Sequence, residues 1–368
     1  MKGLILSGGA GTRLRPLTHT RAKQLVPIAN KPVLFYGIED MAAAGITEIA
    51  IVVGDTHQEI REAVGDGSRF GVSVSYIRQS APLGLAHCVH IARDFLSEDR
   101  FVMYLGDNML EQGLAQFVES FEQANRLNNK EPDSSGNEPC RAQILLTPVE
   151  NPSAFGVAEL DARGCVTKLT EKPKNPGSNL ALVGVYIFDH TIHDAVGAIE
   201  PSDRGELEIT DAIGWLIQNG HRVSHQMLDG WWIDTGKKDP LLECNRLVLD
   251  TLARKVDGAV DAASKVEGRV VLAEGAKLIN STVRGPVAIG ADACIRDSFV
   301  GPYTSIGERC VISDTELDHS VVLEGCRIEG ISRITDSLIG QHVHVERSAG
   351  QRGASRLMLG DHSHLELG

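Results

Sequence analysis

The sequence predicts an α/β protein with a Rossmann-like domain built on a mixed sheet, followed by a C-terminal left-handed parallel β-helix. Two observations support this prediction. In the first half, apolar strand-like runs alternate with helix-like segments, which is typical of a mainly parallel sheet covered by helices. From about residue 258, branched aliphatic residues instead recur every five or six positions, often followed by glycine. That spacing is typical of a hexapeptide-repeat coil.

The expected elements of the first half follow from these apolar patterns. Strands are expected at 2–6, 48–53, 72–77 and 101–105, and helices at about 33–44, 56–64, 84–94 and 112–126. Further strands are expected at 142–149, 156–160, 166–170 and 181–188, with antiparallel members in the same sheet. A helix is expected over 241–255 because apolar residues recur there at helical spacing. The polar, breaker-rich stretch 128–139 predicts a mobile loop.

The C-terminal repeat indicates a specific geometry. Its aliphatic positions are Ile289, Ile295, Val300, Ile306, Ile312, Leu317, Leu323, Ile328, Ile334, Ile339 and Val345. A helix repeats about every 3.6 residues and a strand about every 2, so neither produces these steps. A triangular coil does, with three short strands per turn and one inward-pointing residue on each face. We therefore expect Ile289, Ile306 and Leu323 to stack in one column.

These patterns divide the chain into four parts. A first domain is expected over 1–240, a connecting helix and linker over 241–257, and the coil over 258–346. The tail over 347–368 is expected to cap the coil or to lie on a partner subunit. Because a coil has exposed faces and an open end, we expect the protein to be a homo-oligomer.

Composition narrows the class of protein. The 368 residues carry a formal net charge of −13 with no lysine- or arginine-rich run, which argues against nucleic acid or an acidic membrane surface as partner. The seven cysteines form no C-x-x-C pair, a pattern that suits free thiols in a reducing cytoplasm. We find no signal peptide and no apolar run long enough to span a membrane.

A glycine-rich loop near the N-terminus carries the strongest chemical signal. An apolar run ends at Leu6, and Gly8, Gly9 and Gly11 follow within a few positions. Exposed N–H groups in such a loop form a cradle for anions. The P-loop pattern is absent, and the dinucleotide fingerprint fails because Leu14 would stand at its third glycine. The loop therefore indicates a third kind of phosphate site, with charge supplied by Arg13 and Lys23.

Two stretches, Gly8–Thr18 and Lys23–Pro32, resemble the signature of the sugar-nucleotidyltransferase superfamily. Within it, the chain looks like the glucose-1-phosphate thymidylyltransferases of the long type, through separated motifs over roughly residues 1–245. The resemblance implies transfer of dTMP from dTTP to glucose 1-phosphate, giving dTDP-glucose and pyrophosphate. The sugar phosphate would attack the α-phosphorus in line, with Mg²⁺ as cofactor, so no protein nucleophile is needed.

The same resemblance implies roles for individual residues. Asp107 and Asp234, each after a strand-like run, would bind the metal, while Arg13 and Lys23 would grip the triphosphate. The nucleotide would also contact Leu6, Gly8, Gly9, Gly11, Thr12, Gln79, Pro82 and Gly84. The sugar phosphate would contact Asn108, Gly156, Glu171, Lys172, Val183 and Arg204.

Base recognition is assigned to Gln79 because its side chain offers both a donor and an acceptor, enough to pair with thymine or uracil. Related enzymes often have an acidic residue where this chain has Leu83, and glutamine where it has His87. These departures leave the choice between dTTP and UTP open.

Three alternatives remain at this point. The chain could be a uridylyltransferase or act on another hexose 1-phosphate. It could be bifunctional, since hexapeptide coils also serve as acyltransferases, and His319 would then be the catalytic candidate. This alternative is disfavoured because no insertion loop interrupts the repeats. It could also be a sugar-nucleotide sensor without turnover, although a sensor need not keep Arg13, Asp107 and Asp234.

Overall fold

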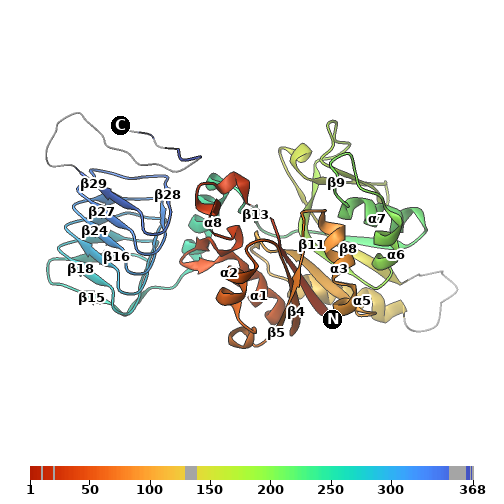
Figure 1. The fold of residues 1–368 in the computed structure, drawn as a ribbon, viewed down its shortest axis with the longest axis horizontal. Coiled ribbons are helices and arrows are strands. Elements are labelled where there is room, and N and C mark those ends of the chain that lie inside the picture. The colour runs from red at the N-terminus through yellow and green to blue at the C-terminus, as the bar shows by residue number, and fades with distance from the viewer. Residues whose placement is uncertain (10, 20, 129–138, 348–361, 365, 367–368) are drawn as a thin grey trace. The chain divides into compact units, whose positions relative to one another are not determined.

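The computed structural model describes residues 1–9, 11–19, 21–128, 139–347, 362–364 and 366. The loop expected over 128–139 and the tail expected over 347–368 lie almost wholly outside the described residues. The chain forms two compact units (Figure 1), and each is described by itself. Unit 1 comprises 1–10 and 34–232, and unit 2 comprises 11–33 and 233–368. Residues 11–33 are thus grouped with the C-terminal half, a grouping that the sequence pattern does not predict.

Unit 1 is built on a mixed sheet of nine strands, as the sequence predicts. The order is β10-β9-β11-β6-β1-β4-β5, with β8 pairing to β11 and β12 to β8. The strands are β1 (Lys2–Ser7), β4 (Glu48–Val53), β5 (Ser73–Arg78), β6 (Phe101–Leu105), β8 (Cys140–Pro148), β9 (Gly156–Leu160), β10 (Val166–Glu171), β11 (Leu180–Phe188) and β12 (Arg222–Met227). β1 pairs in parallel with both β4 and β6, β4 pairs in parallel with β5, and β11 runs antiparallel to β6.

Helices pack against this sheet in unit 1. They are α1 (Val33–Ala43), α2 (His57–Val64), α3 (Leu85–Ile91), α4 (Arg93–Leu96), α5 (Ala115–Asn128), α6 (Ile192–Ala198) and α7 (Ile209–Gln218). Shorter pieces are η4 (Ser68–Phe70), η5 (Pro152–Ala154) and β7 (Asn108–Leu110). The single helix expected over 84–94 is wrong. It is two helices, because Ala92 leaves the helical region with φ −88° and ψ 2°. This bend keeps Val89, Ala92 and Leu96 in the same core.

The parallel strands of unit 1 place several loops at one edge. The carboxyl ends of β1, β4, β5 and β6 lie along this edge, where ligands of open α/β sheets bind. The chain leaves these four ends through Gly8, Gly54, Gln79 and Gly106. β1 lies between β4 and β6, and the sequence crosses to the other side of β1 after β5, so this is a point where the strand order reverses.

Unit 2 begins with short elements and one long helix. These are η1 (Thr12–Leu14), η2 (Leu17–His19), η3 (Lys23–Leu25), the hairpin β2 (Pro27–Ile28) and β3 (Lys31–Pro32), and α8 (Lys238–Thr251). The boundary between the units falls inside β13 (Trp232–Asp234). The helix expected over 241–255 begins earlier and ends earlier, because Leu252 takes an extended conformation (φ −70°, ψ 135°) and the next strand starts at Lys255.

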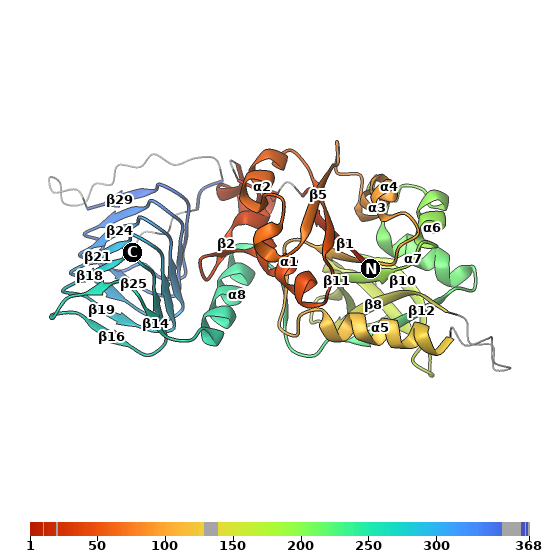
Figure 2. The same ribbon diagram turned by 90° about the horizontal axis from the view of Figure 1, so that it is seen from below.

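The rest of unit 2 is the predicted β-helix, whose three faces are stacks of short parallel strands (Figure 2). The first face has β14 (Lys255–Val256), β17 (Val270–Leu272), β20 (Val287–Ile289), β23 (Thr304–Ile306), β26 (Val321–Val322) and β28 (Leu338–Ile339). The second has β15 (Ala259–Val260), β18 (Lys277–Ile279), β21 (Cys294–Arg296), β24 (Val311–Ser313), β27 (Arg327–Glu329) and β29 (His344–Glu346). The third has β16 (Lys265–Glu267), β19 (Thr282–Arg284), β22 (Phe299–Val300) and β25 (Glu316–Leu317).

One register in the coil differs from the expectation. Ile289 pairs with Ile306, but Ile306 pairs with Val322 rather than Leu323. The coil is one residue shorter at this point, so Val322 enters the column, and Ile339 follows it. The other expected aliphatic positions through Val345 lie in or against the coil's core, and no insertion interrupts the described coils.

Among the described residues, no helix is both long enough and apolar enough to cross a membrane. All seven cysteines are free thiols.

Candidate active site

The glycine loop meets Gln79 at the carboxyl edge of the unit 1 sheet. A Cβ added to Gly54 would lie 2.7 Å from the carbonyl oxygen of Gly8, so the ends of β1 and β4 touch. A Cβ added to Gly8 would lie 3.0 Å from Oε1 of Gln79, the residue after β5. Gln79 is 9% exposed. A buried amide therefore faces the first glycine of the loop.

The Gly84 loop is joined to the segment that contains Arg204. Gly84 has φ 103°, and a Cβ there would lie 2.3 Å from the carbonyl oxygen of Leu207. Leu207 N–H donates to the carbonyl of Leu83 (2.8 Å), and Ala86 N–H donates to the carbonyl of Leu207 (3.0 Å). Only glycine fits at position 84, because a side chain would clash with this backbone and would also be strained at positive φ. The neighbouring Pro82 is exposed.

Asp107 and Asn108 follow β6 and are buried. Nδ2 of Asn108 donates to Oδ1 of Asp107 (3.1 Å), and Nε1–H of Trp232 donates to Oδ1 of Asn108 (2.6 Å). A Cβ added to Gly184 would lie 2.6 Å from the same Oδ1. The backbone beside Val183 therefore approaches Asn108 closely, while Val183 itself is fully buried.

Arg204 lies among three carboxylates. Its guanidinium is 3.4 Å from Glu171, 3.0 Å from Glu206 and 3.3 Å from Glu208. Burial raises the pKa of Glu208, and the neighbouring charge of Glu171 raises it further. The positive charge of Arg204 is thus balanced within the protein, and an arriving phosphate would compete with these carboxylates for it.

Gly156, Glu171 and Lys172 lie together where β9 pairs with β10. Gly156 is opposite Glu171 in the register, and a Cβ on Gly156 would lie 3.1 Å from Oε2 of Glu171. Nζ of Lys172 is 3.2 Å from Oε1 of Glu171. The structure therefore brings the predicted sugar-phosphate residues Gly156, Glu171, Lys172 and Arg204 into one group.

In unit 2, the glycine loop contacts the segment that carries Lys23. Gly11 has φ 62°, and a Cβ there would lie 3.0 Å from Cβ of Lys23. Thr18 Oγ1–H donates to the carbonyl of Gly11 (2.7 Å). Separately, Arg13 lies 3.9 Å from Oδ2 of Asp234, and Gly236 N–H donates to Oδ1 of Asp234 (2.9 Å). Unit 2 therefore brings Gly11 to Lys23 and Arg13 to Asp234.

The remaining predicted residues have simpler positions. Leu6 is a buried residue of β1, Gly9 is exposed, and Thr12 opens η1. Of the two proposed metal ligands, Asp107 belongs to unit 1 and Asp234 to unit 2.

Two residues near the sugar group escaped the sequence reasoning. Trp232 bonds to Asn108, and its ring packs edge-on against Phe155, 5.1 Å between centroids. It stands in the same motif as Asp234, but the sequence does not say which of the adjacent tryptophans turns inward. Thr210 is 1% exposed and lies against Gly156, and its hydroxyl has no hydrogen-bond partner among the described residues.

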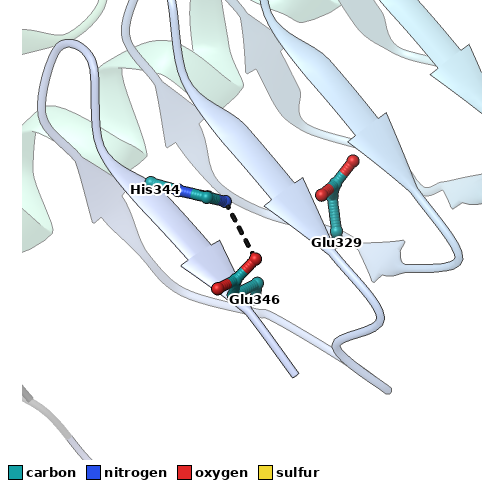
Figure 3. Close-up of side chains that lie close together, drawn as sticks. All are labelled: Glu329, His344 and Glu346. Atoms are coloured by element: carbon teal, nitrogen blue, oxygen red, sulfur yellow. Dashed lines mark ion pairs between the residues drawn. The ribbon is translucent and has the colours of Figure 1, made fainter. Parts of the chain in front are cut away.

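A cluster on the coil could also hold a cation. Glu329 of β27 and His344 and Glu346 of β29 point toward one another (Figure 3), with ligand atoms within 4.8 Å of one another. Glu329 already pairs with Arg327 at 2.9 Å, and His344 with Glu346 at 3.4 Å. These ion pairs account for the arrangement without a metal.

His319, the candidate for acyl transfer, bonds through Nδ1 to Oδ1 of Asp336 (2.5 Å). The described coils have no inserted loop that would build an acyl-donor pocket beside it.

Comparison with known proteins identifies the family. A family model described as nucleotidyl transferase matches residues 2–251, and one described as GMPPB C-terminal domain matches 283–365. Glucose-1-phosphate thymidylyltransferases from Streptomyces griseus and Streptomyces antibioticus are 54% and 52% identical, each over 100% of this chain and 99% of theirs. A Bacillus anthracis crystal structure, assigned as a glucose-1-phosphate thymidylyltransferase, matches with TM-score 0.61 and 35% identity over 69% of this chain and 98% of that one. The chain belongs to the nucleotidyl transferase family and, within it, to the glucose-1-phosphate thymidylyltransferases.

Proposed function

We propose that this protein transfers dTMP from dTTP to glucose 1-phosphate, releasing pyrophosphate and giving dTDP-glucose. The observation that carries the proposal is the edge of the unit 1 sheet, where Gly8, Gln79 and Asp107 follow strands of one parallel set. A phosphate-binding loop, a base-pairing amide and a metal-type carboxylate are the three elements that a nucleoside triphosphate requires. We assign this chemistry to residues 1–240.

The reaction needs positioning and charge neutralisation rather than a protein nucleophile. The sugar phosphate oxygen attacks the α-phosphorus of dTTP, and the bond to the β-phosphate breaks as pyrophosphate leaves from the opposite side. Two anionic substrates repel each other strongly in a site of low dielectric constant, so the site must supply cations. We assign the triphosphate to Arg13 and Lys23, and the sugar phosphate to Lys172 and Arg204.

We further propose that Asp107 and Asp234 together hold Mg²⁺. The donor chemistry fits, because Mg²⁺ prefers one or two carboxylates, with phosphate oxygens and water completing its shell. Asp107 is 8% exposed, and Nδ2 of Asn108 orients one of its oxygens. When bound, the ion would neutralise phosphate charge.

Sugar and base selection rest on the groups in unit 1. Asn108 and Glu171 offer hydrogen bonds to sugar hydroxyls, and a site built around such contacts discriminates strongly against sugars that lack them. Gln79 pairs with the imide edge of the pyrimidine.

A parallel assay of dTTP and UTP with several hexose 1-phosphates, measuring pyrophosphate release, tests the function. We expect dTTP with glucose 1-phosphate to give the highest kcat/KM. Equal rates with UTP would withdraw the thymidylyl assignment, and no pyrophosphate with any pair would indicate a sensor rather than an enzyme.

We also propose a cytoplasmic homo-oligomer. The free thiols suit a reducing compartment. The first coil supports self-association because β14 and β15 each pair on one side only, and Val256 and Val260 on these strands are 38% and 39% exposed. Light scattering coupled to gel filtration would measure the mass, and replacing both valines by lysine is expected to reduce it.

A further inference from the structure

The side chain of Gln79 is held in one orientation by two neighbours in unit 1. Its Nε2 lies 3.4 Å from the carbonyl oxygen of Gly84 and 3.1 Å from Nδ1 of His87, on the first turn of α3. A carbonyl oxygen can only accept a hydrogen bond, so the amide nitrogen must be the group on this side. Both hydrogens of Nε2 are then used within the protein.

The consequence concerns the other end of the amide. Oε1 of Gln79 is directed toward Gly8, the first glycine of the proposed nucleotide loop. An amide whose two hydrogens are already donated can offer a ligand only its oxygen, so the pairing through both a donor and an acceptor that the sequence suggests reduces to one accepted hydrogen bond. That oxygen accepts from the N3–H of thymine or uracil but faces a bare, lone-pair-bearing N3 in cytosine, which repels it.

We propose that His87 is a positioning residue for base selection: by accepting from Nε2 of Gln79, it keeps Oε1 turned toward the base and so favours thymine over cytosine. This inference rests on the proposed function of Gln79.

The ring of His87 must be neutral, with its proton on Nε2, to accept through Nδ1. Burial lowers the pKa of His87, and the neighbouring His90 of the same helix lowers it further. The two rings stack with centroids 6.3 Å apart. His87 is therefore in its accepting form at neutral pH.

Four variants measured at pH 8 test the role. His87→Ala removes the acceptor, and we expect the KM for dTTP to rise about 3- to 10-fold, the worth of one hydrogen bond, with kcat and the KM for glucose 1-phosphate within about 2-fold of wild type. His87→Gln restores an acceptor and should restore the KM. His87→Lys can only donate and would turn the amide round, so the ratio of kcat/KM for dTTP over dCTP should fall about tenfold or more. Asp94→Asn, an exposed change on the following helix α4, is the control and should leave all constants unchanged.

The outcomes separate this inference from the proposed function. If the wild-type protein releases no pyrophosphate from dTTP, the proposed function fails. If it turns over normally but His87→Ala and His87→Lys keep the wild-type KM and base discrimination, the inference alone is overturned. Should His87→Ala fail to fold by thermal melting, the Gln and Lys variants decide: equal base discrimination in these two contradicts the proposal.

Discussion

The two units position their polar residues in different ways. In the coil of unit 2, each strand packs on the strand one turn later, as Ile295 does on Ile312, so contacts join residues close in sequence. In unit 1 the candidate site is assembled from distant segments: Trp232 holds Asn108, and Leu207 holds the Gly84 loop. A repeating coil can therefore be inferred from the spacing of its aliphatic residues. A site at a sheet edge depends instead on how the connections between strands bring distant segments together.

Among the described residues, unit 2 also contains contacts between segments far apart in the sequence, and one such junction centres on α8. Asn245 on α8 is fully buried, and its Oδ1 accepts from Ala29 N–H (2.8 Å) and from Ser305 Oγ–H (2.7 Å). Its Nδ2 donates to the carbonyl of Tyr303 (3.2 Å). This amide ties the β2–β3 hairpin, which follows Lys23, to the coil, and Asn30 at the hairpin turn adds a second bond from its Nδ2 to the carbonyl of Ile306 (2.9 Å). Unit 2 therefore also contains long-range contacts.

The largest expected effect is the loss of kcat when the proposed metal ligand of either unit is replaced. Asp107→Asn and Asp234→Asn should each lower kcat by about 1000-fold, because each removes a charge from the proposed metal site. Steady-state pyrophosphate release measures this. Asp229→Asn, an exposed change near the end of unit 1, is the control and should keep full activity. If only one of the two acidic variants loses activity, the shared metal site is wrong.

Gly84→Ala probes the long-range packing of unit 1. The Cβ of the new alanine would clash with the backbone of Leu207, and alanine would also be strained at the positive φ of position 84. We therefore expect the KM for dTTP to rise about tenfold and the melting temperature to fall by several degrees. Gly214→Ala in α7 is the matched control, because nothing lies within 4 Å of its new Cβ. It should be neutral or stabilising by about 0.5–1 kcal/mol. Equal effects in both variants would contradict the clash.

Asn245→Ala probes the junction of unit 2. It leaves two donors and an acceptor unpaired in the interior, so we expect a loss of about 2 kcal/mol in the free energy of unfolding. Asn125→Ala is the control in unit 1, since Asn125 is 1% exposed and bridges Phe121 and Cys140 by similar bonds. Both variants should lose stability in denaturant titrations. Only Asn245→Ala should speed amide hydrogen exchange at Ala29, and equal exchange in both would show that the junction does not hold the hairpin.

The smallest expected effect is on how the free energy of unfolding depends on pH, through a histidine in the core of unit 1. His193 is 7% exposed, stacks on Phe101, and neither ring nitrogen has a partner among the described residues. Burial lowers the pKa of His193 below the usual value for histidine, about 6.5. As the pH falls, this histidine takes up a proton in the unfolded chain at a higher pH than in the folded protein. It therefore lowers the free energy of unfolding from about pH 6.5 downward. His193→Phe should flatten the fall in unfolding free energy between about pH 7 and pH 5.5, and an unchanged slope would show that His193 does not contribute.

The local patterns predicted most of the fold. The strand ending at Leu6 and the coil columns followed from apolar spacing alone, because burial of one face imposes a period on the sequence. The failures were at places where another part of the chain overrides spacing. Ala92 bends a helix so that both halves reach one core, and Val322 replaces Leu323 because one coil is a residue shorter.

In the candidate site, too, local patterns predict one part and long-range contacts decide the other. The candidate residues are predicted from motifs, but the partners that the structure gives them are not. Glu206 and Glu208 are sequence neighbours of Arg204, but nothing in the sequence indicates that Glu171 joins them, or that Trp232 rather than Trp231 bonds to Asn108. Glu171 and Asn108 come from elements far from Arg204 and Trp232 in the chain, and these contacts depend on how the strands are ordered in the sheet.

The two architectures, the glycine loop and the residue types capable of the chemistry can be inferred from the amino-acid sequence, because each produces a pattern within a few dozen residues. The direction in which the amide of Gln79 faces, and the backbone that fixes Gly84, depend on the folded chain. Those choices are made by hydrogen bonds and steric contacts between neighbours in space, and a linear pattern records neighbours in sequence.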